Sequence, residues 1–245
     1  MENAPVIGMG LIRIAPGVDE EVYKRYRKWA TEVYQPMSMK FPGITEIDQY
    51  EIARKSIQYP SSGAIYHVEN IVALESGAKT PERQAIEEDI NTWVKRGVAE
   101  YIWRAVYGLV QGFRSEAALP GKKGTTIENA PIMHLEAYRM TPEEQEKFNK
   151  WFNEYGGKVF IPLFMKTCGL KGYDYFKFIR VIPTPLETDY PPYLSLLYFE
   201  NLKAFEDFEQ SPEQVGFQSA LRNILPLGLN YRWYVQYKLV GSLRK

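Results

Sequence analysis

The two halves of the chain share five short blocks in the same order. The matching blocks, first half against second, are Glu2–Pro5 with Glu128–Pro131, Pro36–Gly43 with Pro162–Gly169, Glu69–Asn70 with Glu200–Asn201, Thr80–Glu82 with Ser211–Glu213, and Tyr101–Val110 with Tyr231–Val240. Such self-similarity has to be recognised before any element is assigned. We therefore expect residues common to both halves to build the scaffold. Polar residues found in only one half are the better candidates for chemistry.

In each half, the hydrophobic pattern predicts the order strand, helix, strand, strand, helix, strand. The expected strands are 6–14, 44–52, 64–72 and 100–110, then 132–140, 170–179, 193–200 and 230–240. Helices are expected after Asp19 and Thr141, which are N-cap residues, and at 81–94 and 202–225. This pattern divides the chain into a first repeat at 1–112, a linker at 113–127 and a second repeat at 128–245.

A β-α-β-β-α-β unit is the ferredoxin-like arrangement. Two such units in tandem resemble the dimeric α+β barrel superfamily, with both halves on one chain. The resemblance implies an α+β fold class, in which two tandem ferredoxin-like repeats pack their antiparallel sheets face to face as an α+β barrel. It also implies pockets between each sheet and its own helices. Members of the superfamily include EthD-like proteins, cofactor-free monooxygenases, isomerase-like and cyclase-like enzymes, and a haem-binding chlorite dismutase group.

Composition restricts the partners and cofactors. Lys+Arg and Asp+Glu both number 30, so the chain lacks the basic excess typical of nucleic-acid binding. It has no apolar run long enough to cross a membrane, no signal peptide at its start, and one cysteine, Cys168, which together predict a cytoplasmic protein. The two histidines lie in different halves, and no metal-binding spacing occurs. In the haem-binding relatives the axial histidine lies later in the second repeat, where this chain has none. We expect no cofactor, no metal, and a monomer or homodimer.

The first strands of the two halves differ on one face. Their shared face is apolar, but Gly8, Gly10 and Ile12 of the first half correspond to His134, Glu136 and Tyr138 of the second. Burying these polar groups costs free energy unless they pair with each other or with a ligand. We therefore predict that His134, Glu136 and Tyr138 are acid/base residues, Glu136 setting the tautomer or pKa of His134. The alternative is that His134 and Glu136 form a satisfied internal pair.

The glycines suggest a second location for a pocket. Gly8 and Gly10 in a central strand are typical of close approach by a ligand, so a cavity could lie over the first sheet instead. His67 and Asp48 are the polar candidates there, because a carboxyl on an otherwise apolar face suits proton transfer. Asp174 matches Asp48 in the second half, and the presence of an aspartate in both halves favours a structural hydrogen bond over proton transfer.

Aromatic residues supply further candidates for substrate binding. Tyr101, Trp103 and Tyr107, like their counterparts Tyr231, Trp233 and Tyr237, are expected to share one face of the last strand of each repeat. Such rings favour the core but can also line a pocket for a flat ligand. We take Trp103, Trp233 and Tyr175, with Gly8 and Gly10, as candidate substrate-binding residues.

These features together predict a cofactor-independent acid/base enzyme of the lyase, isomerase or cyclase type, acting on a small, apolar, aromatic or polyketide-like molecule. Two alternatives stay open. One is a cofactor-free monooxygenase of a phenolic substrate. The other is a non-catalytic protein that binds a small molecule.

Overall fold

A computed structural model describes residues 5–54, 60–77, 80–114, 130–181, 190–226 and 228–245. The elements of the first half are β1 (Val6–Ile14), α1 (Glu20–Trp29), η1 (Ala30–Tyr34, a π-helix), α2 (Gln35–Ser38), β2 (Ile44–Ile52), β3 (Ser62–Val68), α3 (Ile71–Gly77), α4 (Pro81–Lys95) and β4 (Ala99–Arg114). Those of the second half are β5 (Ile132–Arg139), α5 (Pro142–Trp151), η2 (Phe152–Phe160, a π-helix), α6 (Ile161–Thr167), β6 (Leu170–Val181), β7 (Tyr193–Phe199), α7 (Leu202–Glu209), α8 (Pro212–Ile224) and β8 (Asn230–Arg244). The chain is a mixed α+β protein, as predicted, and the order of its strands and longer helices agrees with the sequence pattern.

The chain forms two compact units. The first contains Met1–Leu109, Phe178–Tyr190 and Leu239–Lys245, and the second contains Val110–Lys177 and Pro191–Lys238. These units differ from the predicted division at residues 112 and 128, because the last residues of β6 and β8 group with the first unit and the last residues of β4 with the second.

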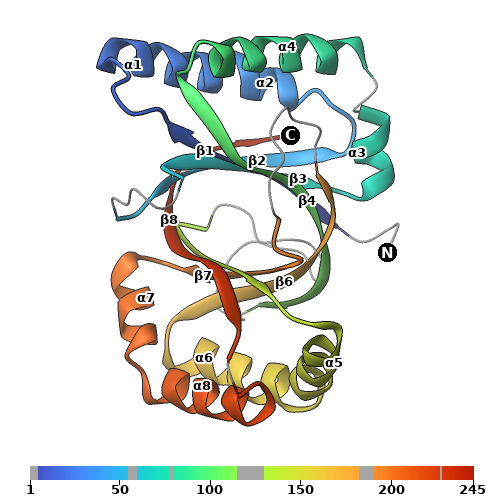
Figure 1. Cartoon of the computed structure of the whole chain (residues 1–245), viewed down its shortest axis with the longest axis vertical. Helices are drawn as coiled ribbons and strands as arrows, with labels where there is room; N and C mark the ends of the chain where they lie inside the picture. The colour runs from blue at the N-terminus through green and yellow to red at the C-terminus, as the bar shows by residue number, and fades with distance from the viewer. Residues whose placement is uncertain (1–4, 55–59, 78–79, 115–129, 182–189, 227) are drawn as a thin grey trace. The chain divides into compact units, whose positions relative to one another are not determined.

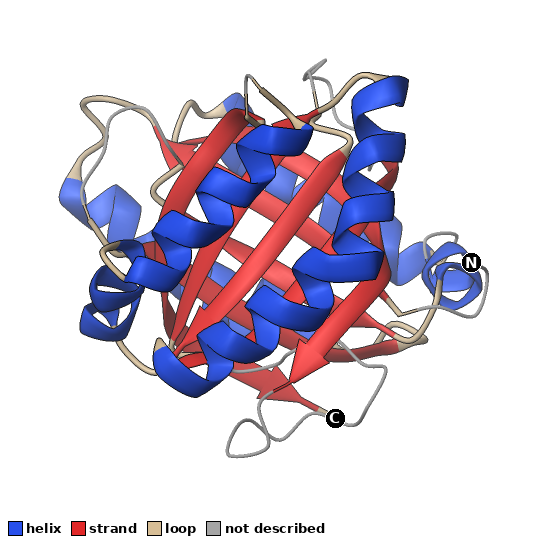
Figure 2. Ribbon diagram, turned by 90° about the horizontal axis from the view of Figure 1, so that it is seen from below, coloured by secondary structure: helices blue, strands red, loops and turns tan. Residues whose placement is uncertain are grey.

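Each unit contains an antiparallel sheet with helices on one face. In the first unit the strand order is β8, β2, β3, β1, β4, and in the second it is β4, β6, β7, β5, β8. The helices α1, α2 and α4 cover the sheet of the first unit, and α5, α6 and α8 cover that of the second (Figure 1). Figure 2 shows helices lying over one face of a sheet. Among the described residues, none of the helices combines the length and apolar character that crossing a membrane requires.

Local sequence signals account for the helix starts. The side chain of Asp19 accepts hydrogen bonds from the backbone of Glu21 and Val22 at the start of α1. Thr141 and Glu144 form a capping box at the start of α5. Both caps were expected from the sequence, and they fix where the polypeptide leaves β1 and β5.

The predicted shared apolar face of the first strands is confirmed as core. Ile7, Met9 and Leu11 on β1 are at most 1% exposed, and their counterparts on β5 are fully buried. The turns before β2 and β6 use Gly43 and Gly169, both with positive φ. At Gly43 a Cβ would lie 2.2 Å from the Cβ of Ala73, so no larger residue fits where α3 approaches the turn.

Candidate functional site

The first unit contains a cavity of about 100 Å³ between the sheet and the helices that cover it. Gly8 and Gly10 of β1 form part of its floor. The predicted alternative location of a pocket, over the first sheet, therefore agrees with this cavity. Its volume is below the roughly 150 Å³ of a closed apolar cavity that holds benzene. We expect a ligand of one ring at most, bound with some movement of flexible lining side chains.

A β-bulge decides which residues of β4 face the cavity. Along β1, Gly10 pairs with Arg104 and Leu11 with Trp103, but Ile12 pairs with Tyr101 because the register shifts by one residue. Tyr101 and Arg104 consequently lie on the same face and both line the cavity. The predicted common face of Tyr101, Trp103 and Tyr107 is therefore wrong. Trp103 pairs with Leu11 of β1 and Tyr107 with Ile7. Both therefore lie on the face turned away from the helices, opposite to the face of Tyr101.

The same bulge occurs in the second unit. Along β5, Ala137 pairs with Trp233 and Tyr138 with Tyr231, with the register shifting between these two pairs. Tyr231 therefore lies on the face covered by helices, whereas Trp233 lies on the other face. The predicted common face is wrong here too, because strand alternation was counted through a bulge that the sequence does not mark.

The helix side of the cavity is formed where α1 continues into the π-helix η1. Its last residue Tyr34 and the following Gln35 line the cavity, and π-helical turns are frequent at functional sites. Tyr34 is hydrogen-bonded to Tyr66 of β3, and the Gln35 side chain accepts a hydrogen bond from Gln49 of β2. These contacts connect the helix to the cavity floor.

Arginines dominate the charge around the cavity. Arg104 is 4% exposed, and its guanidinium is ion-paired with the carboxylate of Glu87 on α4. Glu87 is also ion-paired with Arg83, and Arg27 lies 2.5 Å from Glu51. The charged side chains among the lining residues are those of Arg27, Arg83 and Arg104. A lining of this kind favours an anionic ligand.

Arg104 stays charged despite its burial. Burial acts to lower the pKa of Arg104, but Tyr34, Tyr101 and the hydrogen bond with Glu87 outweigh it, so that the pKa is raised. The guanidinium also lies 5.2 Å from the ring centre of Tyr101, within cation–π range. A permanent cation is thus held against the cavity floor opposite Gly10.

Three phenols of the cavity, those of Tyr66, Tyr101 and Tyr26, stay neutral. Burial raises the pKa values of Tyr66 and Tyr101 well above the ordinary value of a phenol. Burial likewise raises the pKa of Tyr26, which lines the same cavity. Neutral hydroxyl groups can donate hydrogen bonds to an anionic oxygen.

His134 is packed in the core of the second unit. It is fully buried, with its ring 4.7 Å from that of Phe205 and 4.3 Å from that of Tyr234, measured between centroids. Its Nδ1 is 3.0 Å from Nε2 of Gln236, an amide nitrogen that can only donate, so Nδ1 accepts. Its Nε2 is 3.3 Å from Oε1 of Glu136, within ion-pair distance although no hydrogen bond forms. The two side chains are therefore neighbours, but they do not form the satisfied internal pair of the alternative prediction.

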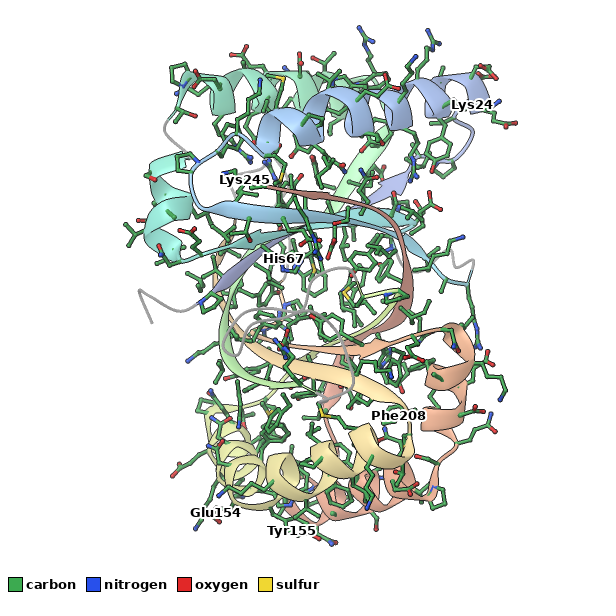
Figure 3. All side chains as sticks on the ribbon, turned by 180° about the vertical axis from the view of Figure 1, so that it is seen from behind. Lys24, His67, Glu154, Tyr155, Phe208 and Lys245 are labelled. Carbon is green, nitrogen blue, oxygen red and sulfur yellow. The ribbon has the colours of Figure 1, made fainter. Side chains whose placement is uncertain are left out.

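Glu136 and Tyr138 line a much smaller cavity of the second unit, of about 20 Å³. The hydroxyl groups of Tyr138 and Tyr173 lie 3.0 and 2.9 Å from Oγ of Ser195. Burial raises the pKa of Tyr138 well above its ordinary value. Phe208, labelled in Figure 3, also lines this space. This space has room for about one water molecule. His134 is not among the residues that line it or the first-unit cavity.

His67 and Asp48 form a buried pair on the other face of the first sheet. Nε2 of His67 is 3.1 Å from Oδ2 of Asp48, and both side chains are at most 3% exposed. His67 pairs with Ile7 across the strands and so lies on the face turned away from the helices (Figure 3). The expectation that these residues serve a cavity over Gly8 and Gly10 is corrected, because they point to the opposite side of the sheet.

The matching position in the second unit has a different partner. Asp174 accepts a hydrogen bond from the hydroxyl of Tyr198 and lies 2.5 Å from Nη1 of Arg114. Both aspartates are fully buried and partnered. A structural hydrogen-bonding role, which the sequence left open, accounts for these contacts.

The aromatic candidates do not line the first-unit cavity. Trp103 is 1% exposed on the far face of the sheet, and Trp233 occupies the same face in the second unit. Tyr175 packs on the helix side of the second sheet, stacked with Tyr193 at 6.2 Å between ring centres. Gly8 and Gly10 are the candidate substrate-binding residues that the cavity includes.

Sequence reasoning missed the polar residues that give this cavity its character. These are Arg104, Tyr34 and Tyr66. A signal was present, because Arg104 corresponds to Tyr234 and Tyr34 to Phe160 in the other half. Among the described residues, no three His, Cys, Asp or Glu side chains gather closely enough to hold a metal ion.

Comparisons with known proteins bear on the fold. No protein-family model matches the chain. No curated protein matches it in sequence. Among solved structures it is similar to an anthrone oxidase-like protein, with a TM-score of 0.66, 12% identity, and coverage of 99% of this chain and 94% of the other.

Two further solved structures are described as monooxygenases. One, from Fusobacterium nucleatum, has a TM-score of 0.60 at 11% identity and covers 100% of this chain and 96% of its own. The other, from Lactobacillus acidophilus, has a TM-score of 0.55 at 14% identity, with 98% and 96% covered. At these identities the likenesses show a shared α+β fold, as expected from the sequence.

Proposed function

We propose that the first-unit cavity is the active site of a cofactor-independent enzyme that ionises a small phenolic or enolisable molecule. Arg104 provides the counter-charge for the oxyanion, and the hydroxyls of Tyr66 and Tyr101 donate hydrogen bonds to it. The observation that carries the proposal is a buried, permanently charged guanidinium on a cavity whose lining also contains the phenols of Tyr66 and Tyr101 and the glycines of β1.

The chemistry follows from where the charge develops. A substrate C–H or O–H bond breaks, its proton passes to water, and the electron pair stays on the substrate as an enolate or phenolate. Fixed donors aimed at that oxygen lower the barrier most strongly in a site with little water. Glu87 is 25% exposed, so this edge of the site reaches solvent for the departing proton. Return of a proton to a different atom completes an isomerisation or cyclisation without any redox change.

A phenol monooxygenase is the second candidate. The same anion is electron-rich and can transfer electrons to dioxygen. Solved structures of the same fold are described as monooxygenases and as anthrone oxidase-like, which makes dioxygen the co-reactant to test. In that case one dioxygen is consumed for each substrate oxidised, whereas an isomerase consumes none.

We also propose that the two halves are tandem ferredoxin-like copies, at 1–112 and 128–245. The matching element order, the corresponding bulges and the five sequence blocks support this proposal. In this proposal the second copy serves mainly as scaffold, with His134, Glu136 and Tyr138 in structural roles. The first copy keeps the open site.

The test measures proton exchange on a one-ring probe. Phenylacetone in deuterium oxide is followed by NMR, and the protein is expected to accelerate loss of the α-proton signals. Arg104→Gln should slow this exchange about 10- to 150-fold, because a hydrogen bond to a charged group contributes about 1.5–3 kcal/mol. Arg13→Gln is the matched control, since Arg13 pairs with Glu100 at the sheet rim, away from the cavity lining.

An oxygen electrode with catechol separates the candidates. Dioxygen uptake that depends on Arg104 favours the monooxygenase. Proton exchange without dioxygen uptake favours the isomerase or cyclase. Tight binding of either probe with neither reaction would leave a binding protein and overturn the enzymatic proposal.

A further inference from the structure

The two first strands carry different groups at corresponding positions facing the helices. Gly10 on β1 pairs with Ala64 on β3 and Arg104 on β4. Glu136 on β5 pairs with Ser195 on β7 and Tyr234 on β8. Gly8 and His134 correspond in the same way, two residues earlier. The backbone surroundings therefore match, while the side chains do not.

In the second unit, these side chains fill the space that is open in the first. The imidazole of His134 lies between Phe205 and Tyr234, with the carboxylate of Glu136 beside it. Only about 20 Å³ remains next to Glu136, compared with about 100 Å³ over the glycines of the first unit. The second unit thus contains a planar ring and a carboxylate where the first has room for a ligand.

We propose that the ligand of the first-unit cavity is a planar ring that carries a carboxylate. It binds over Gly8 and Gly10 in the positions that the His134 ring and the Glu136 carboxylate occupy in the second unit. Its carboxylate faces Arg104, the residue that pairs with Gly10. This inference names the substrate class and rests on the function proposed for the same cavity.

The charges of the two units support the assignment. Arg104 of the first unit corresponds to Tyr234, which pairs with Glu136 in the second, so the strand position without a carboxylate has a cation beside it. The charged side chains among the lining residues of the first-unit cavity are those of three arginines, Arg27, Arg83 and Arg104. A cationic lining of this kind suits a ligand carboxylate.

The position of Gly10 also has the required space. A Cβ added there meets only Tyr101 Cε1, at 3.9 Å, which is ordinary van der Waals contact. The backbone of Gly10 does not have a positive φ. A side chain can therefore be introduced at this position, which makes the comparison with Glu136 testable in the intact protein.

The first experiment compares benzoate with its neutral isostere benzamide by isothermal titration. We expect benzoate to bind at least about tenfold more tightly, as a charge-assisted hydrogen bond provides. Arg104→Gln should abolish the preference, and Arg13→Gln should keep it. Equal affinities for the two ligands in the unmodified protein would overturn the inference.

The second experiment introduces the carboxylate covalently. Gly10→Glu should abolish benzoate binding and melt about 2–4 °C above Gly10→Gln, because the new carboxylate pairs with Arg104. The difference between Glu and Gln should vanish in an Arg104→Gln background. A Gly10→Glu protein no more stable than Gly10→Gln would contradict the proposed position of the carboxylate.

The outcomes separate this inference from the proposed function. Proton exchange that depends on Arg104, together with no preference for benzoate, would contradict the proposed ligand class but support the proposed function. A preference for benzoate without proton exchange would support the ligand class and contradict the enzymatic role. If the protein shows neither proton exchange nor a preference for benzoate, both proposals are wrong.

Discussion

Replacing His134 with Ala tests whether this histidine is structural or catalytic. The ring is fully buried and lies 4.3–4.7 Å from two aromatic rings. Truncating a large buried side chain to Ala costs about 2–5 kcal/mol. The loss also leaves the Gln236 amide without the acceptor that now lies 3.0 Å away, which adds about 1 kcal/mol or more. We expect the free energy of unfolding to fall by about 3–5 kcal/mol, a large share of a typical total.

The measurement is urea unfolding at neutral pH, combined with binding of a one-ring phenol to the folded protein. Stability should fall while the dissociation constant changes less than about twofold, because His134 is not among the residues that line the first-unit cavity. His134→Gln, which keeps polar atoms at the site, should lose less stability and serves if the Ala variant does not fold. A tenfold loss of binding or turnover with stability nearly unchanged would refute the structural interpretation.

Two other predictions concern stability. Burial raises the pKa of Tyr66, so between pH 10 and that raised pKa the unfolded chain loses its proton first and stability falls as pH rises. Tyr66→Phe should therefore make the fall in unfolding free energy above pH 10 shallower by about 1.4 kcal/mol per pH unit, and an unchanged slope would contradict the burial argument. Thr141→Ala removes the capping box of α5 and should lower the free energy of unfolding in urea by about 1 kcal/mol. Thr92→Ala, on the exposed side of α4, is the control and should lower it much less. Equal losses in the two variants would argue against the cap.

The sequence was sufficient for the architecture because local signals and periodicity agreed. Asp19, Thr141 and Pro81 mark helix starts, and the alternation in β1 and β5 identifies the core face. The assignment of the last residues of β4, β6 and β8 to the other compact unit was not predictable. It depends on which strands the ends of long strands such as β4 and β8 pair with, and periodicity does not encode that pairing.

The site was predicted in part, and two physical reasons explain what was missed. Gly8 and Gly10 indicated an open floor, because a strand glycine leaves space. Tyr101 and Arg104 came to share a face only through a bulge with no sequence mark. His67 and Asp48 were assigned to the wrong side, because their face depends on the pairing of β3 with β1. Such pairings are tertiary and had to be observed.

The central claim is that Arg104 stabilises an oxyanion in the first-unit cavity. Absorbance titration of bound 4-nitrophenol tests it directly, since the probe changes colour on ionising. We predict that binding lowers the pKa of the probe by at least about one unit, equivalent to about 1.4 kcal/mol, and that Arg104→Gln returns it to the free value. A bound probe whose pKa equals or exceeds that of free 4-nitrophenol would contradict the account.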